Sequence, residues 1–466
     1  SVMMIFIKGE NSTEIPPVEV TMEELEVKEI EPEVIEEIEE LEEQPVEEAV
    51  PTVEKPDVTP TENTASTEDF NNDMPQTDDN MDFDAVLDIS PNATPLKLSG
   101  LYGGRTNSGR KGMLRRFGGS GAGEAAVLRA LRWLKDHQNK TTGRWPMDST
   151  THGGAMTGLA LLTFLAHGET PLSEEFGNTV QMGIQYLVEK VNKGGERIGG
   201  NGYENGIIAY ALSEAYGLTK IPMIKGPMDK LILSIVEGQQ PSGGFDYGYK
   251  KGARFDVSLS GWQIQALKAA YVSGSTVPGI HKAIEKSSEF LKDVQCKSGA
   301  RKGYFPYSKK GQGTISMTDV ATLCLQLIGE GHSKEALRGV EIIKNNEKVD
   351  WNDKDMHKNA SIHHTKVYNW YYATQAMFHH GKSTWRGWNK MFQPQLIKNQ
   401  ESDGHWELPG GFKEDWTPYY ATTLCTLMLE VYYRYLPTFK LPKKMAGAVA
   451  GGGAFDVDDD VGLIIE

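Results

Sequence analysis

The stretch LIKNQESDGHW, residues 396–406, combines the end of an apolar helix, a glutamine, a turn with glycine and an aromatic residue. The same signature occurs in residues 131–145 (LRWLKDHQNKTTGRW), 232–245 (ILSIVEGQQPSGGF) and 290–305 (FLKDVQCKSGARKGYF). Its glutamines, Gln138, Gln240, Gln295 and Gln400, lie 102, 55 and 105 residues apart, which is two, one and two periods of about 52. Less regular copies at 186–203 and 340–351 fill the gaps. Six units of one period indicate a repeat architecture.

Each unit continues into a second helix, in which apolar residues recur at spacings of three and four. These helices begin near Met156, Gly206, Val257, Met317, Tyr368 and Pro418, at intervals of 50, 51, 60, 51 and 50 residues. Helices that are apolar on more than one side must be covered on more than one side. An inner ring covered by an outer ring satisfies this, and a closed ring needs no capping repeats. The sequence therefore predicts an all-α fold, an α/α toroid of six helical-hairpin repeats.

Charge divides the rest of the chain. Residues 1–98 contain 28 Asp and Glu against 4 Lys, which gives this segment a net charge of −24. The whole chain has a net charge of −16, so the remaining residues carry +8. A net charge of +8 over so long a stretch is too small to indicate nucleic-acid binding, and we expect no nucleic-acid partner.

Composition divides the chain into five segments. We expect them to be 1–10 the end of a membrane anchor, 11–98 an acidic disordered linker, 99–123 a flexible Gly/Arg-rich linker, 124–440 the toroid and 441–466 a Gly-rich acidic tail.

The first residues bear on localisation. Val2–Ile7 is apolar but far shorter than the roughly 20 residues that span a bilayer. Read as the end of a signal anchor, it predicts a membrane-anchored protein with the toroid outside the cytoplasm. A frayed fragment end, on a soluble cytoplasmic protein, is the alternative. The three cysteines, Cys296, Cys324 and Cys425, are too few for a disulfide framework or a Cys-rich zinc site.

The helix–Gln–Gly–aromatic unit resembles the QW repeat of squalene-hopene and oxidosqualene cyclases and the related repeat of protein prenyltransferase β subunits. The similarity covers roughly residues 124–439. The passages GGFDYGY, DVSLSGWQIQAL, YYATQAMF, WRGWN and LEVYYRYLP further resemble bacterial prenyltransferase/squalene-oxidase-repeat proteins. This resemblance implies a terpenoid-cyclase-like toroid, often preceded by a membrane segment and a low-complexity stalk. The motif is mostly structural, so it indicates fold better than activity.

The resemblance implies two chemistries, and neither carries over intact. Cyclases of the squalene-hopene type protonate an alkene with an Asp of a DxDD motif. That string occurs once, at Asp456–Asp459, beyond the last helix, where a water-bathed carboxylate stays ionised. Protein prenyltransferases bind zinc with Asp-x-Cys and a later His. Here Ser258, two residues after Asp256, takes the place of the Cys. One repeat later, residues 316–323 (SMTDVATL) hold no His. Hydroxyls are poor zinc ligands, so we expect no metal and no cofactor, and enzymatic activity stays open.

A weaker constellation lies between Trp351 and His364. It gathers five side chains that could ligate a divalent metal: Asp353, Asp355, His357, His363 and His364. Loops rich in Asp and His are usually only polar, so we favour that interpretation.

Aromatic residues gather in or just before the starts of the second helices. They are Tyr203, Trp262, Trp370, Tyr371, Tyr372, Trp416, Tyr419 and Tyr420. Asp256 and Asp319 lie among them and are the candidate catalytic acids. If these starts converge at one mouth of the ring, they form an aromatic-walled pocket that suits isoprenoid chains. Packing between hairpins is the alternative for about half of them.

We therefore expect the toroid to bind an isoprenoid or another hydrophobic small molecule or lipid in its centre. A non-catalytic scaffold that binds proteins is the second interpretation, and a side-chain-filled centre would favour it. A different toroid enzyme, such as a polysaccharide lyase, is the third and would favour Arg or Lys in the centre. A buried carboxyl group with a strongly raised pKa would favour the first.

Overall fold

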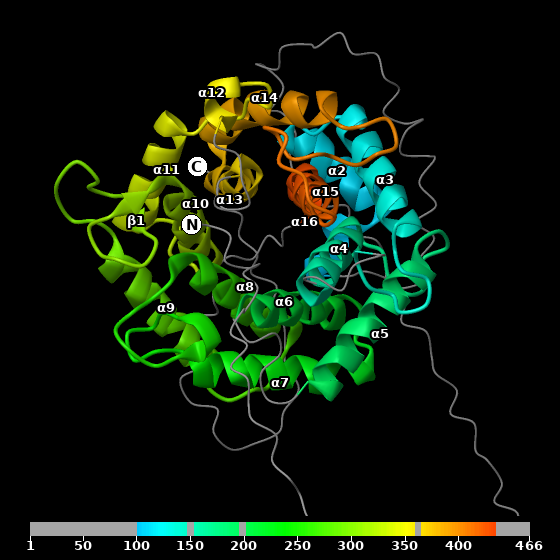
Figure 1. Cartoon of the computed structure of the whole chain (residues 1–466), viewed down its shortest axis with the longest axis horizontal. Coiled ribbons are helices and arrows are strands. Elements are labelled where there is room, and N and C mark those ends of the chain that lie inside the picture. The colour runs from blue at the N-terminus through cyan, green and yellow to red at the C-terminus, as the bar shows by residue number, and fades with distance from the viewer. Residues whose placement is uncertain (1–99, 147–152, 195–201, 359–364, 435–466) are drawn as a thin grey trace, which may run out of the picture. The chain divides into compact units, whose positions relative to one another are not determined.

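The computed structural model describes residues 100–146, 153–194, 202–358 and 365–434. Within these residues, almost entirely buried helices form an inner ring: α4 (Gly153–His167), α6 (Tyr203–Thr219), α8 (Val257–Ser273), α10 (Ile315–Leu327), α13 (Lys366–His380) and α15 (Thr417–Leu429). Each inner helix contacts the next, and α15 contacts α4, which closes the ring (Figure 1).

Amphipathic helices cover this ring from outside (Figure 1). They are α3 (Gly121–Asp136), α5 (Gly177–Lys193), α7 (Pro222–Gly238), α9 (Ile280–Val294), α11 (Lys334–Asn346) and α14 (Lys382–Lys398). In α9, for example, Ile280, Ile284 and Leu291 are buried while Lys282 and Glu285 are exposed. One apolar stripe suffices for an outer helix, whereas an inner helix needs apolar residues all round. The predicted all-α toroid is confirmed.

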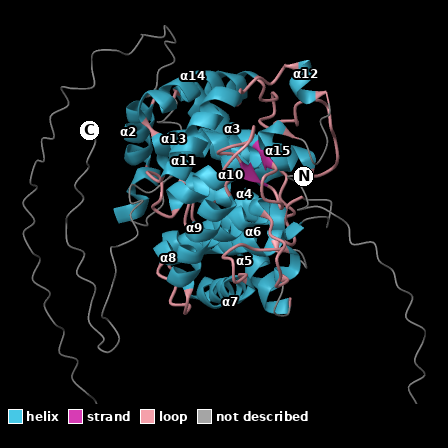
Figure 2. Cartoon of the chain, turned by 90° about the vertical axis from the view of Figure 1, so that its left-hand side faces the viewer, coloured by secondary structure: helices cyan, strands magenta, loops and turns pink. Residues whose placement is uncertain are grey.

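Short elements complete the described chain. They are η3 (Gly100–Arg105), α2 (Asn107–Phe117), η4 (Tyr247–Tyr249), the antiparallel pair β1 (Phe305–Pro306) and β2 (Gly313–Thr314), α12 (Lys354–His357) and α16 (Val431–Arg434). Helices α2 and α12 lie on opposite sides of the ring (Figure 2). Elements η4, β1, β2 and α12 precede inner helices, so they mark the side where these helices begin. Within the described residues, no helix combines the length and apolar character needed to span a bilayer.

The repeated glutamine joins each unit to the next. Gln400 Nε2 donates to Gly404 O of its own turn (2.7 Å) and to Ala126 O of α3 (2.8 Å), which links the last unit to the first. Equivalent pairs of bonds, to a glycine of the same turn and to the next outer helix, are made by Gln138, Gln239 and Gln295. The third unit thus uses Gln239 rather than the predicted Gln240, whose amide donates within its own turn.

A second contact recurs between the turn and the inner helix. The backbone N–H of the turn aromatic donates to a hydroxyl one turn into the inner helix, in the pairs Trp145–Thr157, Phe245–Ser260, Phe305–Thr318 and Trp406–Thr422, at 3.0–3.1 Å. Ser260 of α8 therefore has a structural role in this chain.

Residues 100–117, which we call the clasp, differ from the flexible linker predicted for 99–123. Arg110 is fully buried; it donates to His167 O of α4 (2.6 Å) and pairs with Glu124 of α3 (3.2 Å). Phe117 O accepts a hydrogen bond from Trp385 Nε1 of α14 (2.8 Å). The clasp thus joins the first and last units at the seam of the ring. Composition did not reveal this, because the arginines are buried only by partners distant in the sequence. Residues 1–98 and 441–466, with the DVDD string, lie outside the described residues.

Candidate functional site at the centre of the ring

Side chains of α8 and α13 meet inside the ring, on the inner side of α10, which lies between these two helices. Three contacts join them: Ser258 Oγ with Tyr368 OH (2.8 Å), Gln265 Nε2 with Tyr372 OH (3.2 Å), and the ring of Trp262 with that of Tyr371 (centroids 6.2 Å apart, 17° between planes). All six side chains are buried. The structure therefore brings together three predicted site residues, Trp262, Tyr371 and Tyr372.

Arg434 of α16 reaches across the ring. Its Nη2 donates to Tyr210 OH of α6 (2.8 Å) and to Tyr371 OH of α13 (3.4 Å). Its guanidinium carbon lies 5.8 and 5.9 Å from the two ring centroids. Because α6 and α13 stand opposite each other in the ring, this arginine occupies its centre, with only 3% of its surface exposed.

Sequence reasoning missed three central residues, Tyr210, Tyr368 and Arg434. Tyr210 and Tyr368 lie in second helices that the periodicity located, so the search for central aromatic residues could have included them. Arg434 lies in the passage LEVYYRYLP, but only the structure shows that its helix turns into the ring.

Several buried polar atoms at the centre have no hydrogen-bond partner among the described residues. They are Trp262 Nε1, Gln265 Oε1, Gln375 Oε1 and, one turn along α6 from Tyr210, Ser213 Oγ. Protein interiors normally satisfy such atoms, and exceptions concentrate where a water, ion or ligand binds. The centre therefore has spare hydrogen-bonding capacity among its aromatic rings.

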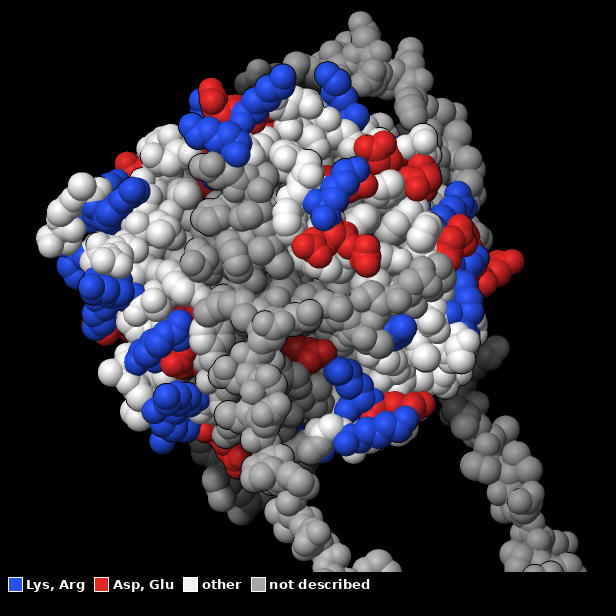
Figure 3. All heavy atoms as spheres, viewed as in Figure 1, with Lys and Arg blue, Asp and Glu red and all other residues white. Residues whose placement is uncertain are grey.

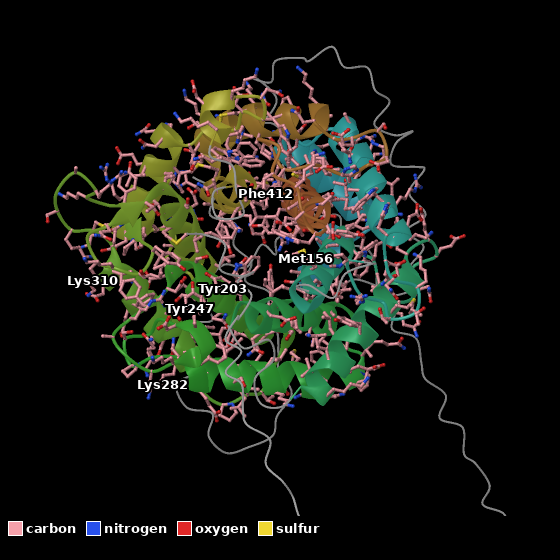
Figure 4. The ribbon with its side chains drawn as sticks, in the orientation of Figure 1. Met156, Tyr203, Tyr247, Lys282, Lys310 and Phe412 are labelled. Carbon is pink, nitrogen blue, oxygen red and sulfur yellow. The ribbon has the colours of Figure 1, made fainter. Side chains whose placement is uncertain are left out.

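Asp256 anchors three tyrosines at the start of α8. It is the N-cap residue, and its Oδ1 accepts from Leu259 N (2.8 Å) and Tyr203 OH (3.4 Å), while Oδ2 accepts from Tyr247 OH (2.8 Å). Tyr247 also shares a short hydrogen bond with Tyr307. Figure 4 shows Tyr203 and Tyr247 next to each other near the middle of the ring. Burial raises the pKa of Asp256, and the hydrogen bonds oppose that shift. This carboxyl group is well satisfied and structural.

Asp319 of α10 is different. Both of its carboxyl oxygens are buried and have no hydrogen-bond partner among the described residues. Burial, and then the nearby carboxyl group of Glu347, raise the pKa of Asp319 well above its usual value, whereas Lys366 lowers it. Glu347 Oε1 in turn accepts from Asn369 Nδ2 (3.1 Å). Burial thus favours the neutral form of Asp319, and no contact described in the structure joins it to Asp256.

Of the other predicted aromatic residues, some lie near the centre of the ring and others lie between hairpins. Tyr420 is buried near Tyr368 and Tyr371, and its ring lies 5.8 Å from that of Trp416. Trp370 faces outward, with its Nε1 bonded to Lys348 O (2.8 Å). Tyr419 packs against Trp133 of α3, with centroids 5.0 Å apart. Trp370 and Tyr419 therefore hold hairpins together and lie away from the centre.

The weaker metal constellation finds no support within the described residues, where no three His, Cys, Asp or Glu side chains are placed to hold a metal ion. Asp353 caps α12, and His357 Nε2 lies 2.9 Å from Asp350 O. His363 and His364 lie outside the described residues.

The rim on the side where the inner helices begin is charged. The turn after α9 exposes Lys297, Arg301, Lys302, Lys309 and Lys310, and the turn after α14 exposes Glu401, Asp403, Glu414 and Asp415. On this face, blue side chains gather along the left-hand edge and red ones right of centre (Figure 3). This rim thus carries charged side chains, whereas Trp262, Tyr371 and Tyr372 are buried inside the ring.

No protein-family model and no curated protein matches this sequence. Solved structures do resemble the ring. An inactive variant of the α-1,6-mannanase GH76A of Salegentibacter sp. HEL1_6, in complex with α-1,6-mannotriose, matches with a TM-score of 0.52 at 12% identity, over 67% of this chain and 99% of the mannanase. A second structure of that enzyme gives 0.51 at 12% identity, over 67% and 98%. The type II terpene cyclase MstE from Scytonema, as a variant in complex with merosterolic acid A, gives 0.46 at 12% identity, over 67% and 96%.

At this identity the mannanase likeness shows the fold alone. Together with the closed inner ring, it defines the chain as an α/α toroid protein, the class that the repeats predict.

Proposed function

We propose that the toroid binds an isoprenoid or another hydrophobic small molecule at the centre of its ring. One observation carries this proposal: Trp262, Tyr371 and Tyr372 meet inside the ring, while the indole N–H and the neighbouring Gln265 carbonyl have no hydrogen-bond partner within the part of the chain that the structure describes. A purely structural core would be expected to pair those atoms.

The chemistry of the centre fits such a ligand. Burial raises the pKa values of Tyr203, Tyr372 and Tyr420 well above the usual value, so these hydroxyls stay neutral. Neutral aromatic walls stabilise an isoprenoid through dispersion and burial, at about 25 cal/mol for each Å² of apolar surface removed from water. Binding requires Tyr368 and Tyr372 to part from α8.

Catalysis, where present, is assigned to Asp319 rather than Asp256. A protonated carboxylic acid can donate a proton to a bound alkene, and of the two candidates Asp319 is the one that is buried and without a hydrogen-bond partner among the described residues. The apolar Val2–Ile7 segment supports the further proposal that the toroid is held at a membrane, outside the cytoplasm.

Two other functions are each favoured by one observation. Tyr368 and Arg434 fill the centre with side chains, which favours a scaffold without a ligand. Arg434 is also the basic central residue that a polysaccharide lyase would need. A lyase would release products with a new carbon–carbon double bond, which are measured by their ultraviolet absorbance.

The first experiment is solvent extraction of the purified full chain followed by mass spectrometry. The Trp262→Ala, Tyr371→Ala variant is compared with the matched control Trp351→Ala, Tyr304→Ala, which changes the same residue types outside the centre. We expect a stoichiometric isoprenoid in the wild type and the control and none in the central variant. A folded wild-type protein that carries no lipid and takes up none of an added polyprenol would overturn the proposal. Activity loss in Asp319→Asn with retained binding would then identify an enzyme.

A further inference from the structure

In each unit a connector joins the turn aromatic to the start of the inner helix, and three connectors carry a pair of adjacent like charges. These pairs are Lys250 and Lys251 in the third unit, Lys309 and Lys310 in the fourth, and Glu414 and Asp415 in the sixth. All six side chains are exposed. The hairpin is held by its glutamine, its turn aromatic and the hydroxyl of its inner helix, so the fold does not account for these charges.

The sequence around each pair extends the same sign of charge. Residues 247–254 contain three Lys and Arg, and residues 296–314 contain five, and neither stretch contains Asp or Glu. Residues 399–416 contain five Asp and Glu against one Lys, a net charge of −4. Two of these charges have partners nearby: Lys310 lies 2.6 Å from Asp293, and Lys413 lies 3.3 Å from Glu407. Exposed ion pairs of this kind contribute little energy, so they leave the charge of each connector available to a partner.

The basic and acidic connectors lie on one face of the ring, on opposite sides of its centre. Both precede inner helices, so they lie on the side where these helices begin. The third and sixth units are three steps apart in a ring of six, so α8 stands opposite α15. Tyr247 of the third connector and Phe412 of the sixth accordingly lie on opposite sides of the middle of the ring (Figure 4). The face is therefore positive over the third and fourth units and negative over the sixth, as the colours of Figure 3 show.

A face with this charge distribution is complementary to itself. A twofold axis in the plane of the face, perpendicular to the line from the third to the sixth unit, places the third unit of each copy on the sixth unit of the other. Lys250 and Lys251 then meet Glu414 and Asp415 twice. Half-buried aromatic rings, Tyr247 and Phe412, belong to the same connectors and would give each contact an apolar part.

We propose that this face binds a second copy of the chain, in a twofold dimer in which the mouths of the two rings face each other. Complementary charges steer the association and exclude the register that would place like charges together. Because these charges are exposed, the dimer should weaken as salt screens them. The dimer does not require a ligand, so this inference is independent of the proposed function.

The first measurement is the mass of the purified full chain by sedimentation velocity over a range of protein concentrations. We expect a dimer in about 50 mM salt, with a Kd at least ten-fold higher in about 500 mM salt, since screening shortens the range of the charges severalfold.

Charge reversal locates the interface. Lys250→Glu with Lys251→Glu, or Glu414→Lys with Asp415→Lys, places like charges at both contacts, and we expect each variant to be monomeric. A mixture of the two variants should form a dimer with one chain of each, because both contacts then join opposite charges. All four changes in one chain should restore the dimer as well. Such restoration also shows that the variants are folded.

The matched control is Lys282→Glu with Lys286→Glu on the outer helix α9 (Figure 4). It makes the same change of charge away from this face and should form dimers as the wild type does.

Four results would overturn the inference. A chain that is monomeric in low salt does not use this face on itself. A dimer that survives both reversals uses another surface, and larger open-ended species would exclude the twofold arrangement. Loss of the dimer on reversal of the lysines but not of the acids would assign the basic connectors to another acidic partner. None of these results concerns the lipid content of the ring, so the proposed function is tested separately.

Discussion

Asp256 and Asp319 show how two aspartates near the starts of neighbouring inner helices acquire different properties. Asp256 caps its helix and accepts hydrogen bonds from tyrosines, as a structural carboxylate does. Asp319 lies within α10 and has no partner among the described residues. Sequence reasoning proposed both as acids because both sit among aromatic residues. The neighbours of each carboxyl group separate the two: hydrogen bonds from Tyr247 and Leu259 hold Asp256, whereas Asp319 lies near the carboxyl group of Glu347.

Glu347 gives the first prediction at this scale. It is the C-cap residue of α11, the place that Gln295 takes in α9 and Gln239 in α7. An ionised Glu cannot donate the hydrogen bonds that those glutamines make. In Glu347→Gln the amide keeps the bond from Asn369 and gains a donor for the Asp319 carboxyl group. We expect the variant to be more stable by about 1 kcal/mol, measured by denaturant unfolding near pH 7.

The pH dependence of this gain has a definite sign. Burial raises the pKa of Glu347 in the folded state, so its contribution to stability is present below the unfolded pKa and is lost as pH rises through the folded pKa. The advantage of Glu347→Gln should therefore be small near pH 4 and grow toward neutral pH. The reverse change, Gln295→Glu, should destabilise the protein. A gain independent of pH would show that the carboxyl group is not the cause.

Among the elements, the hairpin unit was largely predictable. Periodicity located both helices of each unit and the turn between them, but only the structure shows which helices form the inner ring. The third unit was read one residue out of register, because Gln239 and Gln240 are adjacent and only the hydrogen bonds distinguish them. Trp370 and Tyr419 are among the predicted central residues because they lie at second-helix starts, next to Tyr371 and Tyr420. Neighbours in a helix point about 100° apart, so one of each pair faces outward.

The second prediction concerns the joint between units. Gln400→Ala removes the two hydrogen bonds that Nε2 donates to Gly404 O and Ala126 O, and also the two that Oε1 accepts from the exposed Arg129. We expect a loss of about 1–3 kcal/mol in the free energy of unfolding, measured by chemical denaturation. Gln240→Ala removes an amide that donates only within its own turn and should cost less. Equal effects of the two changes would mean that the joint between units adds nothing.

At the scale of the whole molecule, the clasp is the feature that the sequence did not predict. Its glycine and arginine content is typical of a linker, and the burial of Arg105 and Arg110 depends on groups up to 329 residues away in the chain. Composition describes a segment in isolation, so it could not show that these charges are paired inside the ring.

The third prediction tests the clasp. Arg110→Met leaves Glu124 buried without one of its cationic partners, and we expect a loss of about 3–5 kcal/mol, since breaking a buried ion pair leaves an uncompensated charge. Arg115→Met, an exposed change in the same helix, is the control. Thermal unfolding measures both variants. A loss of less than about 1 kcal/mol in Arg110→Met would show that the ring closes without the clasp.

Closure of the ring also sets an order of events during synthesis. Gln400 bonds to Ala126 across 274 residues, and α15 packs on α4, so the first unit is complete long before its last neighbour exists. At about 5–20 residues per second, the interval from Gly121 to Arg434 is roughly 15–60 s. During that time the growing chain is an open arc with an apolar face at its leading end. The nascent protein should therefore depend on chaperones until its last hairpin leaves the ribosome.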